Sequence, residues 1–252
     1  SIKVILFLTT IIILLLSNIL YAQTSQDIIL KPGFNFISFT QSINLTPSQL
    51  KAFNSAITDI YLYSSNAGSF LSASEGTLTS LAAGKGYIIK NSTDTNIKIT
   101  ISGNELSKIN SINLKTGFNL VGFSQSSNNV NFNKLMSDNT IIKGIYKWSS
   151  AAGSFIQVVR NDSGTITLID GVDPTIRNGE SYFFNVYTDS ILTYDNFNVF
   201  FTPSQYTIKP KLSTPLIFPN GTSFSNSQLI SITCSTSNAI IKYTTDGSLP
   251  SL

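Results

Sequence analysis

The sequence predicts a mainly β fold, in which two homologous small β-rich domains with one short helix each precede a third strand-rich segment. One observation is a stretch used twice, at residues 30–39 and 114–123. In each copy a glycine opens a run in which apolar residues alternate with Asn, Ser or Gly, the pattern of a half-buried strand entered through a turn. The other is composition: only 12% of the residues are charged, whereas exposed helices favour Glu, Lys and Arg.

Further landmarks recur in the same order. Ile60-Tyr61 matches Ile145-Tyr146, and residues 84–87 match residues 179–182. The offset is 84 at the first glycine (33 to 117), 85 in the middle and 95 at the last tyrosine (87 to 182). A constant offset that then grows indicates one duplicated module with an insertion late in its second copy. We place the modules at residues 27–103 and 109–201.

One helix is predicted in each module. In the first module, Thr46 is the expected N-cap, a proline follows it, and Gln49 completes a capping box. We expect two to three turns, with Leu50 and Phe53 facing inward. In the second module, residues 131–136 replace this helix with a weaker cap.

Residues 1–22 have the form of a secretory signal peptide. A basic Lys3 precedes a long apolar core, and Ala22 stands at the expected cleavage position. The alternative is an uncleaved membrane anchor, because the apolar run approaches spanning length. We favour cleavage, after which no segment remains that is apolar enough to span a membrane. The single cysteine, Cys234, precludes an internal disulfide, which is typical of bacterial export. We expect a secreted or cell-surface protein on the extracellular side of a bacterial envelope.

Residues 202–215 contain three prolines and are predicted to be a linker. Residues 216–252 are again strand-rich and end in Tyr243-Thr244-Thr245-Asp246-Gly247-Ser248-Leu249-Pro250. This ending resembles the hairpin of the β-sandwich module named after the C-terminal domain of chitobiase and β-hexosaminidase. The resemblance implies the start of an immunoglobulin-like β-sandwich, truncated at residue 252, with no catalytic residues of its own. Asp246-Gly247 itself predicts a turn with positive φ at the glycine.

The duplicated module is similar to repeats of large bacterial and archaeal surface and secreted proteins. The shared features are the Gly-aromatic-Asn-aliphatic start at Gly33 and the Gly-x-Gly-Tyr end at Tyr87. That similarity implies secretion and a modular architecture.

Several functional classes are excluded or disfavoured. The chain has no histidine, the commonest general base and metal ligand, so a Ser-His-Asp site is excluded. Asp59, Glu75 and Asp94 have no acidic counterpart in the second module, so we interpret them as surface acids rather than members of a catalytic pair. No Lys/Arg cluster accompanies the net charge of +3, which argues against nucleic acid. We expect no enzymatic activity and no organic cofactor in this chain.

The insertion in the second module carries Asp162, Asp170 and Asp173. Their oxygens are the ligand type that Ca²⁺ prefers. The alternative, which we favour, is that the Asp-Gly pairs simply form turns.

Four aromatic residues are the strongest candidates for binding: Tyr61, Tyr63, Tyr146 and Trp148. They occupy alternate positions of two equivalent strands, so each pair shares one face of a sheet. On an open face these rings would stack on sugars or on a partner surface. The alternative, which we favour from the sequence, is that they form the core of each module.

We therefore predict a non-catalytic region of an exported modular bacterial protein that displays or spaces a binding surface at the cell envelope. The ligand class expected first is a polysaccharide or cell-wall polymer, and a surface partner protein is the other possibility. Two alternatives stay open. One is the N-terminal region of a secreted hydrolase whose catalytic domain lies beyond residue 252. The other is a structural surface-layer or adhesin stalk.

Overall fold

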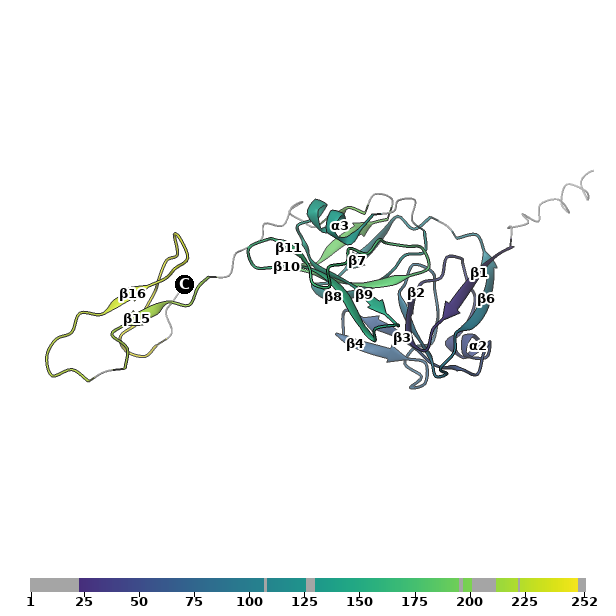
Figure 1. The fold of residues 1–252 in the computed structure, drawn as a ribbon, viewed down its shortest axis with the longest axis horizontal. Coiled ribbons are helices and arrows are strands. Elements are labelled where there is room, and N and C mark those ends of the chain that lie inside the picture. Colours follow the sequence, from purple (N-terminus) through teal and green to yellow (C-terminus); the bar gives the residue numbers. More distant parts are fainter. Residues whose placement is uncertain are drawn as a thin grey trace, which may run out of the picture. The chain divides into compact units, whose positions relative to one another are not determined.

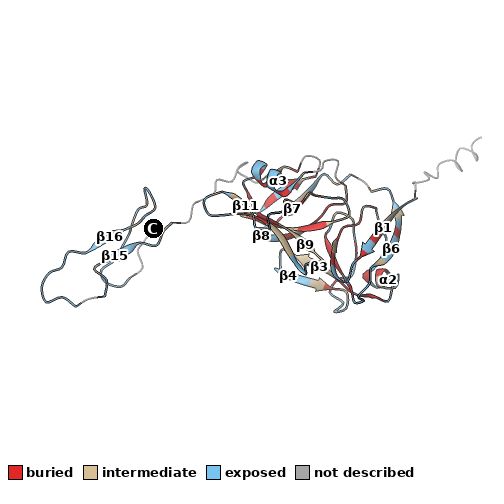
Figure 2. Cartoon of the chain, viewed as in Figure 1, coloured by how far each residue is buried: buried red, intermediate tan, exposed pale blue. Residues whose placement is uncertain are grey.

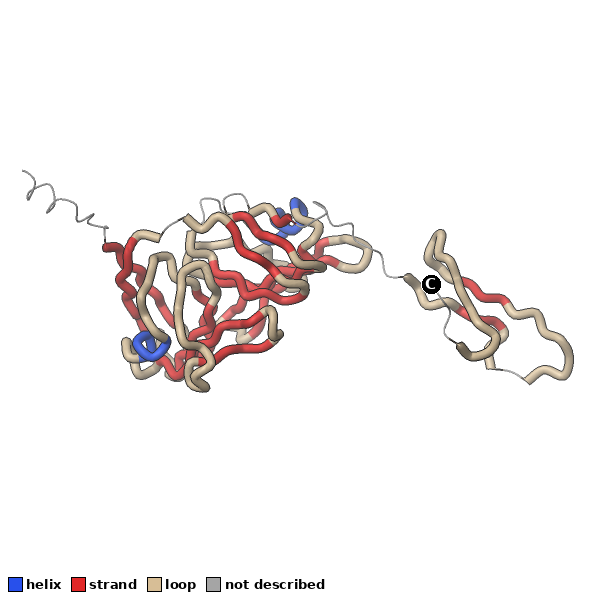
Figure 3. Tube along the Cα trace, turned by 180° about the vertical axis from the view of Figure 1, so that it is seen from behind, coloured by secondary structure: helices blue, strands red, loops and turns tan. Residues whose placement is uncertain are grey.

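A computed structural model describes residues 23–106, 108–125, 130–194, 197–200, 212–221 and 223–248. Of the described residues, 42% lie in strands and 6% in helices, so the fold is mainly β, which confirms the predicted fold class (Figure 3). Within the described residues, one compact unit holds both modules, and a second holds residues 162–164 and those from 212 onward. The predicted signal peptide and residues 202–211 of the predicted linker lie outside the described residues.

The first module contains two antiparallel sheets and one helix. Its elements are β1 (Gln23–Leu30), β2 (Gly33–Ile37), α2 (Pro47–Lys51), β3 (Ile57–Ser64), β4 (Ser69–Ser72), β5 (Tyr87–Asn91) and β6 (Ile97–Asn104). The larger sheet has the strand order β2-β5-β3-β4, and β1 pairs with β6 along its whole length.

The second module repeats this plan (Figure 1). Its elements are β7 (Ser111–Leu114), β8 (Gly117–Gly122), α3 (Phe132–Asp138), β9 (Ile142–Ser149), β10 (Ser154–Arg160), β11 (Ile166–Leu168), β12 (Ser181–Val186), β13 (Ser190–Thr193) and β14 (Val199–Phe200). The sheets have the orders β11-β10-β9-β12-β8 and β14-β13-β7. Strand β11 has no counterpart in the first module and lies in the predicted insertion.

The repeated glycine-phenylalanine-asparagine sequence forms the same turn in both modules. Gly33 and Gly117 have φ of +81° and +87°, a region that costs glycine little. Asn35 Oδ1 accepts a 2.8 Å hydrogen bond from the Lys31 N–H, and its Nδ2 donates to the Lys31 carbonyl at 2.8 Å. Asn119 makes the same two bonds to Lys115. The asparagine side chain therefore forms hydrogen bonds with backbone N–H and C=O groups that the turn leaves without a partner in a neighbouring strand.

The capping box of the first helix is confirmed, but the helix is shorter than expected. The Gln49 N–H donates to Thr46 Oγ1 at 3.2 Å, and the Thr46 N–H donates to Gln49 Oε1 at 2.8 Å. The helix spans only Pro47–Lys51. Leu50 is fully buried, as predicted, whereas Phe53 is 47% exposed. The expectation for Phe53 was wrong because the helix ends before it, so helical periodicity no longer decides where its ring lies.

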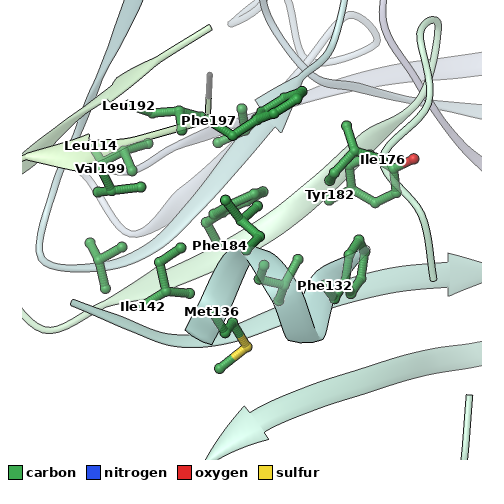
Figure 4. Close-up of a cluster of buried hydrophobic side chains, with 14 of the residues drawn as sticks. Leu114, Phe132, Met136, Ile142, Ile176, Tyr182, Phe184, Leu192, Phe197 and Val199 are labelled. Atoms are coloured by element: carbon green, nitrogen blue, oxygen red, sulfur yellow. The ribbon is translucent and has the colours of Figure 1, made fainter. Parts of the chain in front are cut away.

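Each module has its own hydrophobic core. In the second module, Phe132 and Met136 of α3 lie beside Phe184 of β12 (Figure 4). Related ring pairs occur in both cores: Phe39 lies 5.5 Å from Tyr87, and Phe123 lies 5.7 Å from Tyr182, between ring centroids. Each module therefore buries the inner face of its larger sheet within itself.

The second unit is described by itself. Strand β15 (Leu216–Phe218) pairs with β16 (Ser231–Thr233). Gly247 has φ of +79°, as its Asp-Gly turn predicts, and Asp246 Oδ1 accepts from the Ser248 N–H at 3.0 Å. Many apolar side chains of this unit are exposed (Figure 2). The immunoglobulin-like sandwich stays a prediction.

Within the described ranges, no helix has both the length and the apolar character needed to cross a membrane.

Candidate binding site between the two modules

The modules meet through contacts that are exchanged reciprocally. Ile37 forms an antiparallel β-bridge with Glu180, and Val121 forms one with Lys85. Ile37 and Val121 are equivalent positions of the repeat, and so are Lys85 and Glu180. Reciprocal exchange of this kind is the signature of a two-fold relation between two copies. The Ser38 N–H also donates to the Gly179 carbonyl at 2.9 Å. The two modules are therefore joined about a local two-fold pseudo-axis.

The tyrosine that closes each Gly-x-x-Tyr motif fixes the loop at this junction. The Ala82 N–H donates to Tyr87 Oη at 2.8 Å, and the Arg177 N–H donates to Tyr182 Oη at 2.9 Å. Burial raises the pKa of both phenols. The loops before β5 and β12 are thereby held in matching positions against the other module.

An aromatic cluster fills the space where the larger sheets of the two modules face each other. We use that name for Phe34, Phe36, Tyr61, Tyr63, Phe70, Phe118, Tyr146, Trp148, Phe155 and Phe183. The strands that carry most of it, β2, β3, β8 and β9, lie together in Figure 1. All ten residues lie outside the two module cores.

The four predicted aromatic residues therefore do not form the module cores, and that preference was wrong. Tyr61 and Tyr63 lie on the face of β3 that points away from the first core, and Tyr146 and Trp148 lie likewise on β9. Duplication supplies a second sheet with the same kind of face, and the two faces meet. All four side chains are of intermediate exposure.

The rings of the two modules contact one another directly. Phe36 stacks on Trp148 with centroids 5.7 Å apart and an interplanar angle of 26°, and Tyr63 meets Phe183 edge to face at 5.3 Å. These are the geometries that aromatic pairs prefer. The packing is nevertheless open at the rim, because Phe34 is 39% and Phe118 is 42% exposed.

Two grooves open in this cluster. Groove A has a volume of about 440 Å³ and includes Tyr61 and Trp148; its lining residues are Phe34, Phe36, Tyr61, Phe70, Ile88, Trp148, Phe155 and Phe183. Groove B has a volume of about 340 Å³ and includes Tyr63 and Tyr146; its lining residues are Tyr63, Phe118, Tyr146, Phe155, Gln157 and Phe183. Among the described residues, no charged side chain lines either groove.

A larger polar pocket adjoins groove A. It has a volume of about 580 Å³, and it shares Phe36 and Trp148 with groove A. An ion pair between Lys147 Nζ and Glu180 Oε2, at 2.6 Å, forms part of its wall. Tyr182 Oη also donates to Glu180 Oε2, at 2.5 Å. This pocket places hydrogen-bonding groups beside the aromatic rings, an arrangement that the sequence pattern did not indicate.

The indole of Trp148 connects the polar pocket with groove A. Its Nε1 is buried and has no hydrogen-bond partner within the described part of the chain. A buried donor without a partner is uncommon in folded proteins. Trp148 is also the only tryptophan in the sequence, so its fluorescence reports on this site alone.

The three aspartates predicted as Ca²⁺ ligands accept hydrogen bonds from backbone N–H groups of β10 and α3 or face solvent. Asp170 Oδ2 accepts from the Gln157 N–H at 3.0 Å, and Asp173 Oδ1 accepts from the Asn133 N–H at 2.9 Å. Asp162 is exposed in the turn after β10. No group of three acidic, cysteine or histidine residues suited to a metal occurs in the described ranges. Ca²⁺ binding by these residues stays a prediction.

Asp59 is not the surface acid that we expected. Its residue is 8% exposed, and Oδ2 accepts from the Ser72 hydroxyl at 2.8 Å. Oδ1 accepts from the N–H groups of Ile60 and Ser74. Burial by itself would raise the pKa of Asp59, but these hydrogen bonds outweigh it and lower that pKa. Asp59 thus fixes the turn after β4.

In comparisons with known proteins, the chain matches no family model, no curated protein and no solved structure. The resemblances of the repeat and of residues 216–252 therefore stay predictions.

Proposed function

We propose that the two modules form a non-catalytic binding region of an exported bacterial protein, and that the aromatic cluster binds a neutral polysaccharide or cell-wall polymer. The observation that carries this proposal is the pair of uncharged grooves lined by half-exposed aromatic rings. Large apolar surface left open to water in a folded protein marks an interaction site more often than it marks idle surface.

The chemistry of a sugar fits this lining. A pyranose ring with equatorial hydroxyls presents flat C–H faces, which stack on aromatic rings, and carries its hydroxyls around the edge. Groove A offers rings such as Tyr61 and Trp148 for the face. The neighbouring polar pocket, with Lys147 and Glu180, offers partners for the edge. Tyrosine and tryptophan are suited to such half-wet sites because they combine an apolar body with a polar end.

The charge of the grooves favours a neutral ligand. A phosphate-bearing polymer would need cationic partners, and none of the described residues that line either groove is cationic. A cation that lies nearby is Lys90, whose Nζ is 5.8 Å from the centroid of the Phe34 ring. A purely structural stalk would need no open groove between its modules. The open grooves therefore favour a role in binding over a role as a spacer. The same region would serve a hydrolase whose catalytic domain follows, so the proposal concerns the binding surface and not the whole protein.

Retention on insoluble polymers tests the proposal. The chain expressed from residue 23 is applied to chitin, cellulose and peptidoglycan, and we expect retention on at least one of them. Phe34→Ala removes a ring from groove A, and we expect affinity to fall about tenfold, the effect of losing one stacked ring.

The matched control is Phe53→Ala. Phe53 is 47% exposed in the same module but lines neither groove, so its removal should leave retention unchanged. Circular dichroism establishes that both variants fold. If the wild-type chain passes through all three polymers, or if both variants weaken retention equally, the proposal is wrong.

A further inference from the structure

Grooves A and B are related by the internal duplication. Phe34 and Tyr61 line groove A, and their equivalents Phe118 and Tyr146 line groove B. In both grooves these two rings contact each other, with centroids 6.2 Å apart in groove A and 5.4 Å apart in groove B. The repeat has therefore built the same pair of rings twice.

The opposite module completes each groove with the same position of the repeat. Trp148 reaches groove A from the second module, and Tyr63, its equivalent, reaches groove B from the first. Phe155 and Phe183 line both grooves. The exchange of Trp148 and Tyr63 between the modules is what the local two-fold relation of the junction requires. The two grooves are therefore quasi-equivalent sites.

We propose that grooves A and B are two subsites for the same neutral glycan, so that each chain binds two short oligosaccharides. This inference rests on the proposed function. When both subsites bind the same polymer strand, or two neighbouring strands, the overall affinity rises because the second contact becomes intramolecular. A region that must hold a polymer at the cell envelope would gain from this avidity without tight binding at either groove.

The two subsites differ in strength. Groove A contains an indole, the larger ring, and adjoins the polar pocket through Phe36 and Trp148. Groove B contains a phenol at the same position, and Gln157 is its one amide. More stacking area and more hydrogen-bond partners make groove A the tighter subsite.

Titration calorimetry and tryptophan fluorescence separate the two subsites. The probes are cellotetraose and N-acetylchitotetraose, added to the chain expressed from residue 23. Calorimetry counts all bound ligand, and we expect two sites per chain. Tryptophan fluorescence comes only from Trp148, which lines groove A and not groove B, so we expect it to saturate with the tighter site.

Matched variants assign the sites. Phe34→Ala should leave one site and abolish the fluorescence change, whereas Phe118→Ala should leave one site and keep that change. The rings of Phe34 and Phe118 are 39% and 42% exposed, so we expect both variants to fold. The number of sites per chain is measured on the wild-type protein and does not depend on either variant.

The outcomes separate the two proposals. One site per chain, or no tetrasaccharide binding by a chain that is retained on a polymer, overturns the two-subsite arrangement and leaves the proposed function standing. Loss of the fluorescence change in Phe118→Ala also overturns it. A chain that binds neither the tetrasaccharides nor any polymer overturns both.

Discussion

Ser38 and Gly122 occupy equivalent positions of the two repeats and face each other at the junction of the modules. A Cβ atom on Gly122 would lie 2.5 Å from Ser38 Oγ and would also collide with the Lys85 carbonyl. Ser38 Oγ in turn donates to that carbonyl at 3.1 Å and lies 2.9 Å from Ser124 Oγ. The space between these two equivalent positions admits a side chain from only one of them. The two copies of the repeat therefore differ here, with serine at position 38 and glycine at position 122.

Gly122→Ala should destabilise the protein by about 1–3 kcal/mol, because the added methyl group overpacks the junction. Urea unfolding followed by the fluorescence of Trp148 measures this loss. Adding Ser38→Gly should recover only part of it, since the Lys85 carbonyl still collides with the new Cβ. Full recovery of stability in the double variant, or no loss of stability in Gly122→Ala, would contradict this close packing at the junction.

Asn35→Ala and Asn119→Ala should destabilise to a similar extent, by about 1–3 kcal/mol each, because each leaves the same backbone groups of a turn without a partner. The variants Asn35→Asp and Asn119→Asp keep the acceptor for the lysine N–H but place a buried carboxylate oxygen against the carbonyls to which the amide donates, so at pH 7 they should destabilise at least as much as the alanine variants. Thermal unfolding compares the four. A large effect in one module with none in the other would contradict the equivalence of the two turns.

Acid should weaken the protein through Asp59, whose pKa is lowered in the folded state. A group with a lowered folded pKa stabilises above its unfolded pKa of about 3.9, and this contribution is lost as pH falls through the folded pKa. Asp59→Asn should therefore cost about 1–3 kcal/mol at pH 7 and show a shallower loss of stability below about pH 5. Urea unfolding across this range measures both. Parallel pH profiles for the two proteins would rule out this role for Asp59.

Alkali should weaken the protein through three buried tyrosines. Burial raises the pKa of Tyr87, Tyr182 and Tyr194, and the neighbouring Glu180 adds to the effect at Tyr182. A raised folded pKa gives stability that is present below the unfolded pKa of about 10 and is lost as pH rises further.

Absorbance at 295 nm follows the ionisation of these phenols. We expect a fraction of the tyrosines to ionise only together with loss of the folded near-ultraviolet dichroism. Titration of every tyrosine near pH 10 in a protein that stays folded would contradict this burial.

Features that depend on neighbouring residues could be predicted from the sequence. The capping box of Thr46 and Gln49 and the turn at Gly33 involve residues at most a few positions apart, so their chemistry is complete within the local sequence. Phe53 shows where this reasoning ends. Its predicted burial assumed a longer helix, and the end of a helix depends on packing as much as on propensity.

The mainly β fold, the duplication and the alternation that puts Tyr61 with Tyr63, and Tyr146 with Trp148, on one face of each sheet follow from the pattern of residues along the chain. What those faces pack against follows from the tertiary structure. Alternation fixes which residues share a face, but not which face covers which, because that depends on contacts between residues of different modules. Asp59 likewise depends on tertiary contacts, because its hydrogen bonds come from Ser72 and Ser74 on a neighbouring strand and turn. The two grooves exist because two such faces pack against each other and remain open at the rim.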